Sequence, residues 1–153
     1  VGTEEKAKVA KKIGCDLVIN YNEDDFEKAS FHFTNGKGVD VIYDSVGKST
    51  FHKGISLLKK KGRIVSFGFS SGKIQPFDIN QLRPISGSIA TGGLLTYISN
   101  SLEMQENADK LFKLIDQQLL KIFIYKEYKI EDIKEAHFQL ENRKTIGKII
   151  FNI

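Results

Sequence analysis

Three segments rich in glycine and serine are the part of this sequence best suited to bind a flat, charged ligand. Each follows a short apolar run: Asp44-Ser45-Val46-Gly47, Gly68-Phe69-Ser70-Ser71-Gly72 and Thr91-Gly92-Gly93. Small residues let a ligand approach backbone N–H and C=O groups that a larger side chain would cover. One such turn is ordinary in any fold. Three in succession predict a cofactor crevice.

Residues for other kinds of chemistry are scarce. The single Cys15 excludes an internal disulfide and cannot build a zinc site of the usual composition. Its apolar neighbours predict a buried thiol. His32 and His52 have no partner that would indicate a catalytic triad or a metal site, and His137 falls in the middle of a predicted helix and is interpreted as structural. The sequence therefore predicts no catalytic residue and no metal ligand.

Strands and helices alternate along the first half of the chain and must position these segments. The strands are nearly continuous apolar runs, which is typical of a parallel sheet covered on both faces. The predicted strands are 17–19, 39–43, 62–68, 88–91, 121–125 and 148–153. The predicted helices are 4–13, 49–60 and 103–119, the first of them capped by Thr3. Two further helices are predicted: one that is capped by Asn22 and closed by Asn35-Gly36, and a closing helix that ends before Arg143.

The bulk properties exclude several classes of partner. A chain of 153 residues with 41% hydrophobic residues is one domain by size and can bury a core. The net charge is +4, and the only basic cluster, 59–63, is typical of a solvated helix end, so no nucleic-acid partner is predicted. No apolar run approaches the roughly 20 residues that span a bilayer, and no signal peptide is visible. We expect a cytoplasmic location without a membrane partner.

An ordered set of motifs resembles a known family. The stretch 128–137, followed by Leu140-Glu141-Asn142-Arg143 and Gly147-Lys148-Ile149-Ile150, resembles the C-terminus of the medium-chain dehydrogenase/reductase family. Four further motifs are similar to its zinc-free quinone oxidoreductase (zeta-crystallin-like) branch: 1–6, 18–21, 43–47 and 62–68. The resemblance covers essentially all 153 residues. It implies a Rossmann-like doubly wound α/β fold, a homodimer, and NADPH-dependent hydride transfer to a quinone or other enone.

The resemblance also implies which residues contact NADP(H). Gly2 and Thr3 correspond to the turn near the adenosine ribose, and Lys6 with Tyr21 to the contacts of the 2′-phosphate, where a lysine charge and a tyrosine hydroxyl both suit a dianion. Glu4 and Glu5 oppose that preference if they turn inward. Thr91 and Gly92 correspond to positions beside the nicotinamide carboxamide, and Arg143 corresponds to a basic position that reaches the cofactor. The positions along the ribose, pyrophosphate and nicotinamide are Ser45, Val46, Phe67, Gly68, Phe69 and Ser70.

Simpler interpretations of the same residues stay open. Lys6 can be an exposed helix lysine, and Tyr21 a half-buried ring at the sheet edge. The small-residue segments can be ordinary turns, and Phe67 can belong to the core. Arg143 is also favourably placed at the C-terminal end of a helix dipole.

The glycine-rich phosphate loop of the family does not occur in this sequence, because no G-x-G-x-x-G is present. We therefore expect residues 1–153 to be a partial dinucleotide-binding domain, inactive alone, with the loop and the GroES-like catalytic domain upstream. With the usual strand order 3-2-1-4-5-6, the chain would keep strands 3 to 6. Such a sheet leaves an apolar edge at 39–43, and unpaired edges invite association. We predict that a partner strand, a missing piece of the protein or an altered pairing covers it.

Two other functions compete with this one. The chain can be a non-catalytic α/β module that self-associates through strands such as 88–91 and binds no dinucleotide. It can also be an S-adenosylmethionine-dependent methyltransferase, whose sheet carries a strand like 39–43. That class needs a glycine-rich first turn and an acidic residue after the second strand, and neither is visible.

Overall fold

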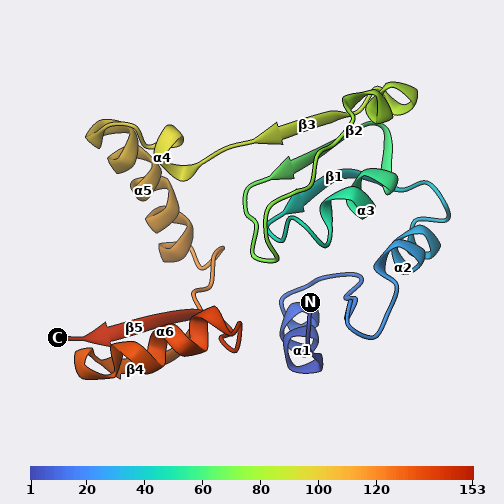
Figure 1. Ribbon diagram of the computed structural model, residues 1–153. Helices are drawn as coiled ribbons and strands as arrows, with labels where there is room; N and C mark the ends of the chain where they lie inside the picture. The colour runs from blue at the N-terminus through green and yellow to red at the C-terminus, as the bar shows by residue number, and fades with distance from the viewer. The chain divides into compact units, whose positions relative to one another are not determined.

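The computed structural model describes every residue from Val1 to Ile153. The chain divides into two units, Val1–Tyr97 and Ile98–Ile153, each with its own parallel strands (Figure 1). This arrangement of helices and parallel strands confirms the α/β class that the sequence predicts. None of the helices combines the length and the apolar character needed to cross a membrane.

Three parallel strands form the centre of the first unit. They are β1 (Val39–Asp44), β2 (Leu58–Ser66) and β3 (Ser88–Thr91), hydrogen-bonded in the order β1-β2-β3. Figure 1 shows their arrows side by side and pointing the same way. The predictions for β1 and β3 are confirmed, β1 with one residue more. All three strands are in register at their ends, so they present their carboxyl ends at one edge of the sheet.

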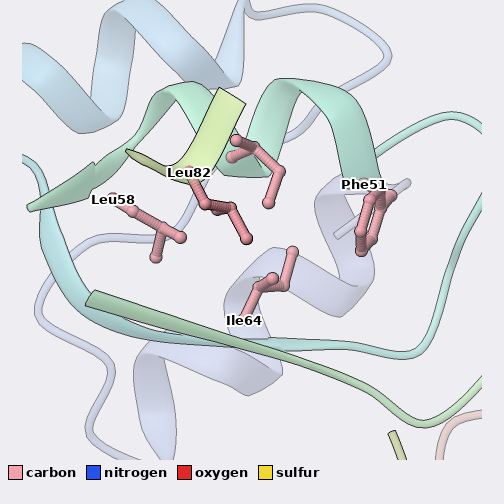
Figure 2. Close-up of a cluster of buried hydrophobic side chains, with 5 residues drawn as sticks. Phe51, Leu58, Ile64 and Leu82 are labelled. Carbon is pink, nitrogen blue, oxygen red and sulfur yellow. The ribbon is translucent and has the colours of Figure 1, made fainter. Parts of the chain in front are cut away.

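Helices cover one face of this sheet around a small core. The helix α3 (Phe51–Ser56) joins β1 to β2, and the 3-10 helix η1 (Ile79–Ile85) precedes β3. Ile64 of β2 is completely buried, and the side chains packed around it come from all three of these elements: Phe51, Ile55, Leu58 and Leu82 (Figure 2). Burying such side chains contributes about 1.5–3 kcal/mol each.

Gly54 lets α3 lie close to the sheet. A Cβ atom at this position would lie 3.2 Å from Ile64 Cδ1 and 3.5 Å from Ile42 Cδ1. The helix is shorter than the predicted 49–60, because β2 already begins at Leu58, which pairs with Val39 of β1. The apolar residue Leu58, which we interpreted as part of a helix face, is therefore the first residue of a strand.

The helix α1 (Glu4–Lys12) has the caps that the sequence predicts. The Thr3 hydroxyl accepts a hydrogen bond from Lys6 N, and the helix ends before Gly14, whose φ is +105°. The predicted strand 17–19 is wrong. Two strand-like hydrogen bonds join Val1 to this segment: Val1 N donates to Ile19 O at 2.8 Å, and Tyr21 N donates to Val1 O at 3.0 Å. One bridge of this kind is too short to form a ladder. Cys15, predicted to be buried, is exposed.

The helix α2 (Phe26–Phe33) begins later than expected. Its cap is Asp25 and not Asn22: Asp25 Oδ1 accepts from Glu27 N at 3.0 Å and from Lys28 N at 3.3 Å. The hydrogen bond from Lys28 N is the main reason that the pKa of Asp25 lies below its usual value. The end of the helix at Asn35-Gly36 is as predicted.

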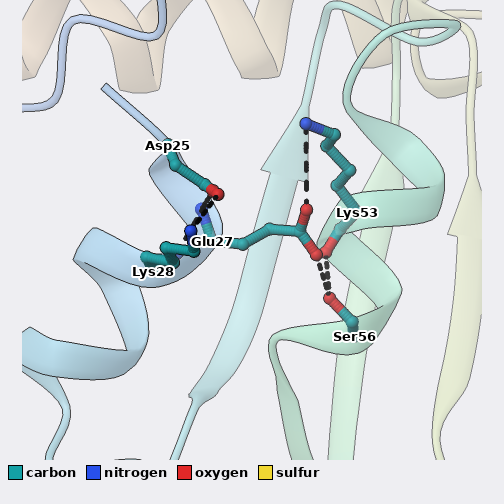
Figure 3. Close-up of polar contacts among 5 residues, drawn as sticks. All are labelled: Asp25, Glu27, Lys28, Lys53 and Ser56. Atoms are coloured by element: carbon teal, nitrogen blue, oxygen red, sulfur yellow. Dashed lines mark hydrogen bonds and ion pairs between the residues drawn. The ribbon is translucent and has the colours of Figure 1, made fainter.

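A polar contact ties α2 to α3. The Glu27 carboxylate accepts a hydrogen bond from Ser56 Oγ at 2.7 Å and lies 3.8 Å from Lys53 Nζ (Figure 3). Both partners belong to α3, so this one side chain links two helices that are 18 residues or more apart in the sequence. Both side chains of the ion pair are partly exposed, and such pairs stabilise proteins by less than about 1 kcal/mol.

The second unit contains a two-stranded parallel sheet. Its elements are the helix α5 (Ser101–Asp116), β4 (Ile124–Lys129), the short 3-10 helix η2 (Ile130–Asp132), α6 (Ile133–Glu141) and β5 (Lys148–Asn152). The closing helix and strand are confirmed. The predicted strand 121–125 is displaced, because only Ile124 and the residues after it pair with β5. The helix α4 (Leu94–Tyr97), in the first unit, was not predicted.

The outer edge of β1 has no strand beside it. Val41 is 46% exposed and Tyr43 is 74% exposed. An altered pairing within the chain, one of the three ways in which we expected this edge to be covered, therefore does not occur. Cover by a partner strand or by a further segment stays a prediction.

Candidate functional site

The carboxyl ends of β1, β2 and β3 form the edge of the sheet at which the predicted site residues gather. Asp44 pairs with Ser66, and Ser66 with Thr91, so the three strands end level with one another. In open parallel sheets, ligands bind in the crevice outside these ends.

The loops after β1 and β2 contact each other directly. Ser45 O accepts a hydrogen bond from Ser70 N at 3.2 Å, and Val46 O accepts from both the N (2.8 Å) and the Oγ (2.7 Å) of Ser71. A Cβ atom on Gly68 would lie 2.7 Å from Ser45 O, closer than real Cβ atoms approach. The structure therefore brings the predicted residues 45–46 and 67–70 together, and Gly68 allows this approach.

A hollow of about 240 Å³ lies between the ends of β2 and β3. Its lining includes five predicted residues: Phe67, Gly68 and Phe69 after β2, and Thr91 with Gly92 at the end of β3. Phe67 is 56% exposed and Phe69 is 70% exposed, so neither ring belongs to the core. Exposed aromatic faces beside small residues suit a planar ring system. Lys73 also lines the hollow and was not among the predicted residues.

Gly2 and Tyr21, two of the residues predicted at the adenosine end of the cofactor, lie close together. A Cβ atom on Gly2 would lie 2.9 Å from the hydroxyl oxygen of Tyr21, so a larger residue would collide with that ring. Thr3 caps α1, and Lys6 follows in its first turn. Tyr21 in turn lines a groove of about 440 Å³ together with Ser45 and Val46. This groove joins Tyr21 to the carboxyl end of β1.

Arg143 belongs to the second unit. It directly follows α6 with a φ of +57°, and its backbone N donates to Leu140 O at 3.0 Å. Its predicted contact with the cofactor stays a prediction.

Asp44 belongs to the first of the predicted small-residue segments, but it was not among the residues predicted to contact the cofactor. Its Oδ1 accepts three hydrogen bonds, from Val46 N (2.8 Å), Gly47 N (3.1 Å) and Thr50 Oγ1 (2.8 Å). Its Oδ2 is buried and accepts none. The residue is 5% exposed, and it lines the same groove as Tyr21. An aspartate before a small-residue turn was visible in the sequence, but only the structure shows that half of the carboxylate is unused.

The donor set of this chain does not fit a zinc ion. No three His, Cys, Asp or Glu side chains are grouped so that they could hold a metal, and structural and catalytic zinc sites need three or four such ligands. Gly47 and Gly68 stand where a Cβ atom would collide with neighbouring backbone, so these glycines let the loops after β1 and β2 pack against each other.

Comparison with known proteins places the chain in a family. Residues 13–151 match the zinc-binding dehydrogenase family. The chain is 37% identical to quinone oxidoreductase 1 of Escherichia coli (strain K12), over 96% of this chain and 46% of that protein. It is 36% identical to a 2-haloacrylate reductase of a Burkholderia species, over 98% of this chain and 46% of that protein. The chain thus spans about half the length of these curated relatives.

Solved structures give the same result. The E. coli quinone oxidoreductase complexed with NADPH has a TM-score of 0.91 and 35% identity, with 100% of this chain and 48% of that one covered. A quinone oxidoreductase of Pseudomonas syringae has a TM-score of 0.90 and 31% identity, with 100% of this chain and 47% of that one covered. This chain therefore belongs to the zinc-binding dehydrogenase family.

Proposed function

We propose that these residues form the cofactor-binding part of an NADP(H)-dependent oxidoreductase that reduces a quinone or another electron-poor enone. One observation carries the proposal: the segments predicted to bind the cofactor contact each other at the carboxyl ends of β1 and β2, through the hydrogen bond from Ser70 N to Ser45 O. The likeness to an E. coli quinone oxidoreductase complexed with NADPH supports it.

Each part of the site then has a task in binding. The bend 67–70 and the turn 45–46 present backbone groups along the ribose and pyrophosphate. Phe67 and Phe69 lie against the flat ring, with Thr91 and Gly92 beside its carboxamide. Lys6 and Tyr21 hold the 2′-phosphate that distinguishes NADP(H) from NAD(H). When bound, the nicotinamide supplies the hydride, and the residues of this chain bind and orient it.

The names of the relatives support one kind of electron acceptor as the substrate. A quinone and a 2-haloacrylate both contain a carbon–carbon double bond conjugated to a carbonyl group, which is the acceptor that a hydride donor reduces. The 2-haloacrylate reductase is 36% identical to this chain and the E. coli quinone oxidoreductase is 37% identical. We propose that the substrate is a conjugated compound of this class.

A fluorescence titration with NADPH and NADH tests the proposal. It is made on the product of the whole open reading frame that contains these residues, with and without Lys6→Ala. We expect tighter binding of NADPH, and we expect Lys6→Ala to weaken it roughly fivefold, or about 1 kcal/mol, with NADH unaffected. The matched control Lys8→Ala removes an exposed lysine from the same helix. Equal affinity for NADPH and NADH, or equal effects of both variants, would contradict the assignment of Lys6.

The same titration separates the alternatives. No binding of either nucleotide would favour the non-catalytic self-associating module. A parallel titration with S-adenosylmethionine that shows binding of this compound, and of neither nucleotide, would favour the methyltransferase. The homodimer and the cytoplasmic location stay predictions, which gel filtration and cell fractionation would test.

A further inference from the structure

The hollow between the ends of β2 and β3 has a wall of apolar side chains. Phe67, Phe69 and Ile74 line it, and both phenylalanine rings are exposed. A third ring lies at the end of β3, where a Cβ atom on Gly92 would be only 2.8 Å from Tyr97 Cε2. Exposed ring faces suit a flat, conjugated molecule that can lie against them.

Lys73 is the one ionisable residue in the lining of the hollow. Its ammonium group makes no ion pair and no hydrogen bond, whereas Lys28, Lys53 and Lys59 each lie within 4 Å of a carboxylate. No aspartate or glutamate lines the hollow, so none would repel an anion there. The charge of Lys73 is therefore available to a negatively charged ligand.

The position of Lys73 separates it from the 2′-phosphate end of the nucleotide. The groove that Tyr21 lines does not include Lys73, which shares its hollow with Thr91 and Gly92. Under the proposed function, Thr91 and Gly92 lie beside the nicotinamide carboxamide. The electron acceptor must lie against the nicotinamide to receive a hydride. A ligand group that reaches Lys73 from this side belongs to the acceptor.

We propose that the acceptor is a small conjugated acid, whose carboxylate pairs with Lys73 while its flat part lies against Phe67 and Phe69. This inference rests on the proposed function, because that function places the acceptor beside the nicotinamide. It narrows the substrate from conjugated compounds in general to those that carry a negative charge. It also makes Lys73 the residue that selects them.

Other occupants of the hollow use only one of its two features. A neutral quinone fits the aromatic rings but leaves the ammonium group without a partner. An inorganic anion pairs with the ammonium group but gains nothing from the rings. A conjugated acid uses both features, as ligands do in pockets that combine apolar walls with a few polar groups.

The pairing should contribute a modest factor to binding. Lys73 is exposed, so water and salt screen its charge, and exposed ion pairs are weak. We expect a carboxylate to bind roughly fivefold more tightly than a neutral molecule of the same shape. The difference should shrink as the salt concentration rises.

Benzoate and benzamide test the proposal, because they share a flat conjugated shape and differ in charge. Their dissociation constants are measured by ligand-observed NMR on the product of the whole open reading frame, with and without saturating NADP⁺. We expect benzoate to bind roughly fivefold more tightly, and Lys73→Gln to remove that difference. The matched control Lys48→Gln should leave it unchanged, because Lys48 is an exposed lysine beside Gly72 that does not line the hollow.

Equal binding of benzoate and benzamide to the unmodified protein would overturn the proposal, and so would equal effects of Lys73→Gln and Lys48→Gln. A protein that binds no NADP⁺ would refute the proposed function instead. In that case the comparison without nucleotide still decides whether Lys73 binds a carboxylate.

Inhibition kinetics distinguish the acceptor from the cofactor as the partner of Lys73. Benzoate should compete with 1,4-benzoquinone, and Lys73→Gln should raise its inhibition constant roughly fivefold without changing kcat/KM for the neutral quinone. A residue with a merely structural role would change both constants. Competition of benzoate with NADPH would assign Lys73 to a phosphate of the cofactor and would overturn the proposal.

Discussion

Gly68→Ala tests whether the approach of the two loops holds the site together. The added Cβ atom would lie 2.7 Å from Ser45 O and 3.1 Å from Ser45 Cα, and both are backbone atoms that no side-chain rotation can move. An ordinary contact at this position requires about 3.4 Å or more, so the bend after β2 must move away from the end of β1 by more than half an ångström. Overpacking of this kind costs about 1–3 kcal/mol.

Gly93→Ala is the matched control, because a Cβ atom there would meet nothing within 4 Å. Urea unfolding followed by circular dichroism measures both variants. We expect Gly68→Ala to lose about 2 kcal/mol, which corresponds to roughly 4–8 °C in Tm, and Gly93→Ala to stay within about 0.5 kcal/mol of the parent. NADPH affinity should also fall in Gly68→Ala. Equal stability of the two variants would refute the reasoning.

Two further predictions concern the fold that carries the site. Ile64→Ala empties the centre of the core, where the side chain is 0% exposed, and should cost about 2–5 kcal/mol in urea unfolding, whereas Ile79→Ala at a 70% exposed position should be nearly neutral. The lowered pKa of Asp25 means that its ionised form stabilises α2, fully above the ordinary value of 3.8 and progressively less as the pH falls through the lower folded value. Asp25→Ala should therefore lower the urea midpoint at pH 7 but not near pH 2, and the same loss from Asp24→Ala would contradict this.

The elements that were predicted most accurately are marked by local features of the sequence. The strands β1 and β3 are short apolar runs bounded by glycines, and α1 has both a threonine cap and a terminal glycine. These signals are local, so the rest of the fold does not override them. The small-residue ends of β1, β2 and β3 were recognised for the same reason, and the parallel register then brings them to one edge.

The features that were missed depend on partners distant in sequence. Residues 17–19 are apolar enough for a strand, but only Val1 is there to pair with them. Leu58 fits a helix face by its spacing, yet its pairing with Val39 makes it the first residue of β2. The role of Asp44 could not be predicted either, because hydrogen-bond satisfaction is a property of the packed carboxylate and not of the residue type.

The central claim is that the carboxyl ends of β1, β2 and β3 line a cleft for NADP(H). A crystal structure of the whole open reading frame product with NADPH tests this most directly. The account predicts that the nucleotide lies against residues 45–46 and 67–70, with its 2′-phosphate beside Lys6 and Tyr21. A nucleotide that binds elsewhere and does not touch residues 45–46 and 67–70 would contradict it.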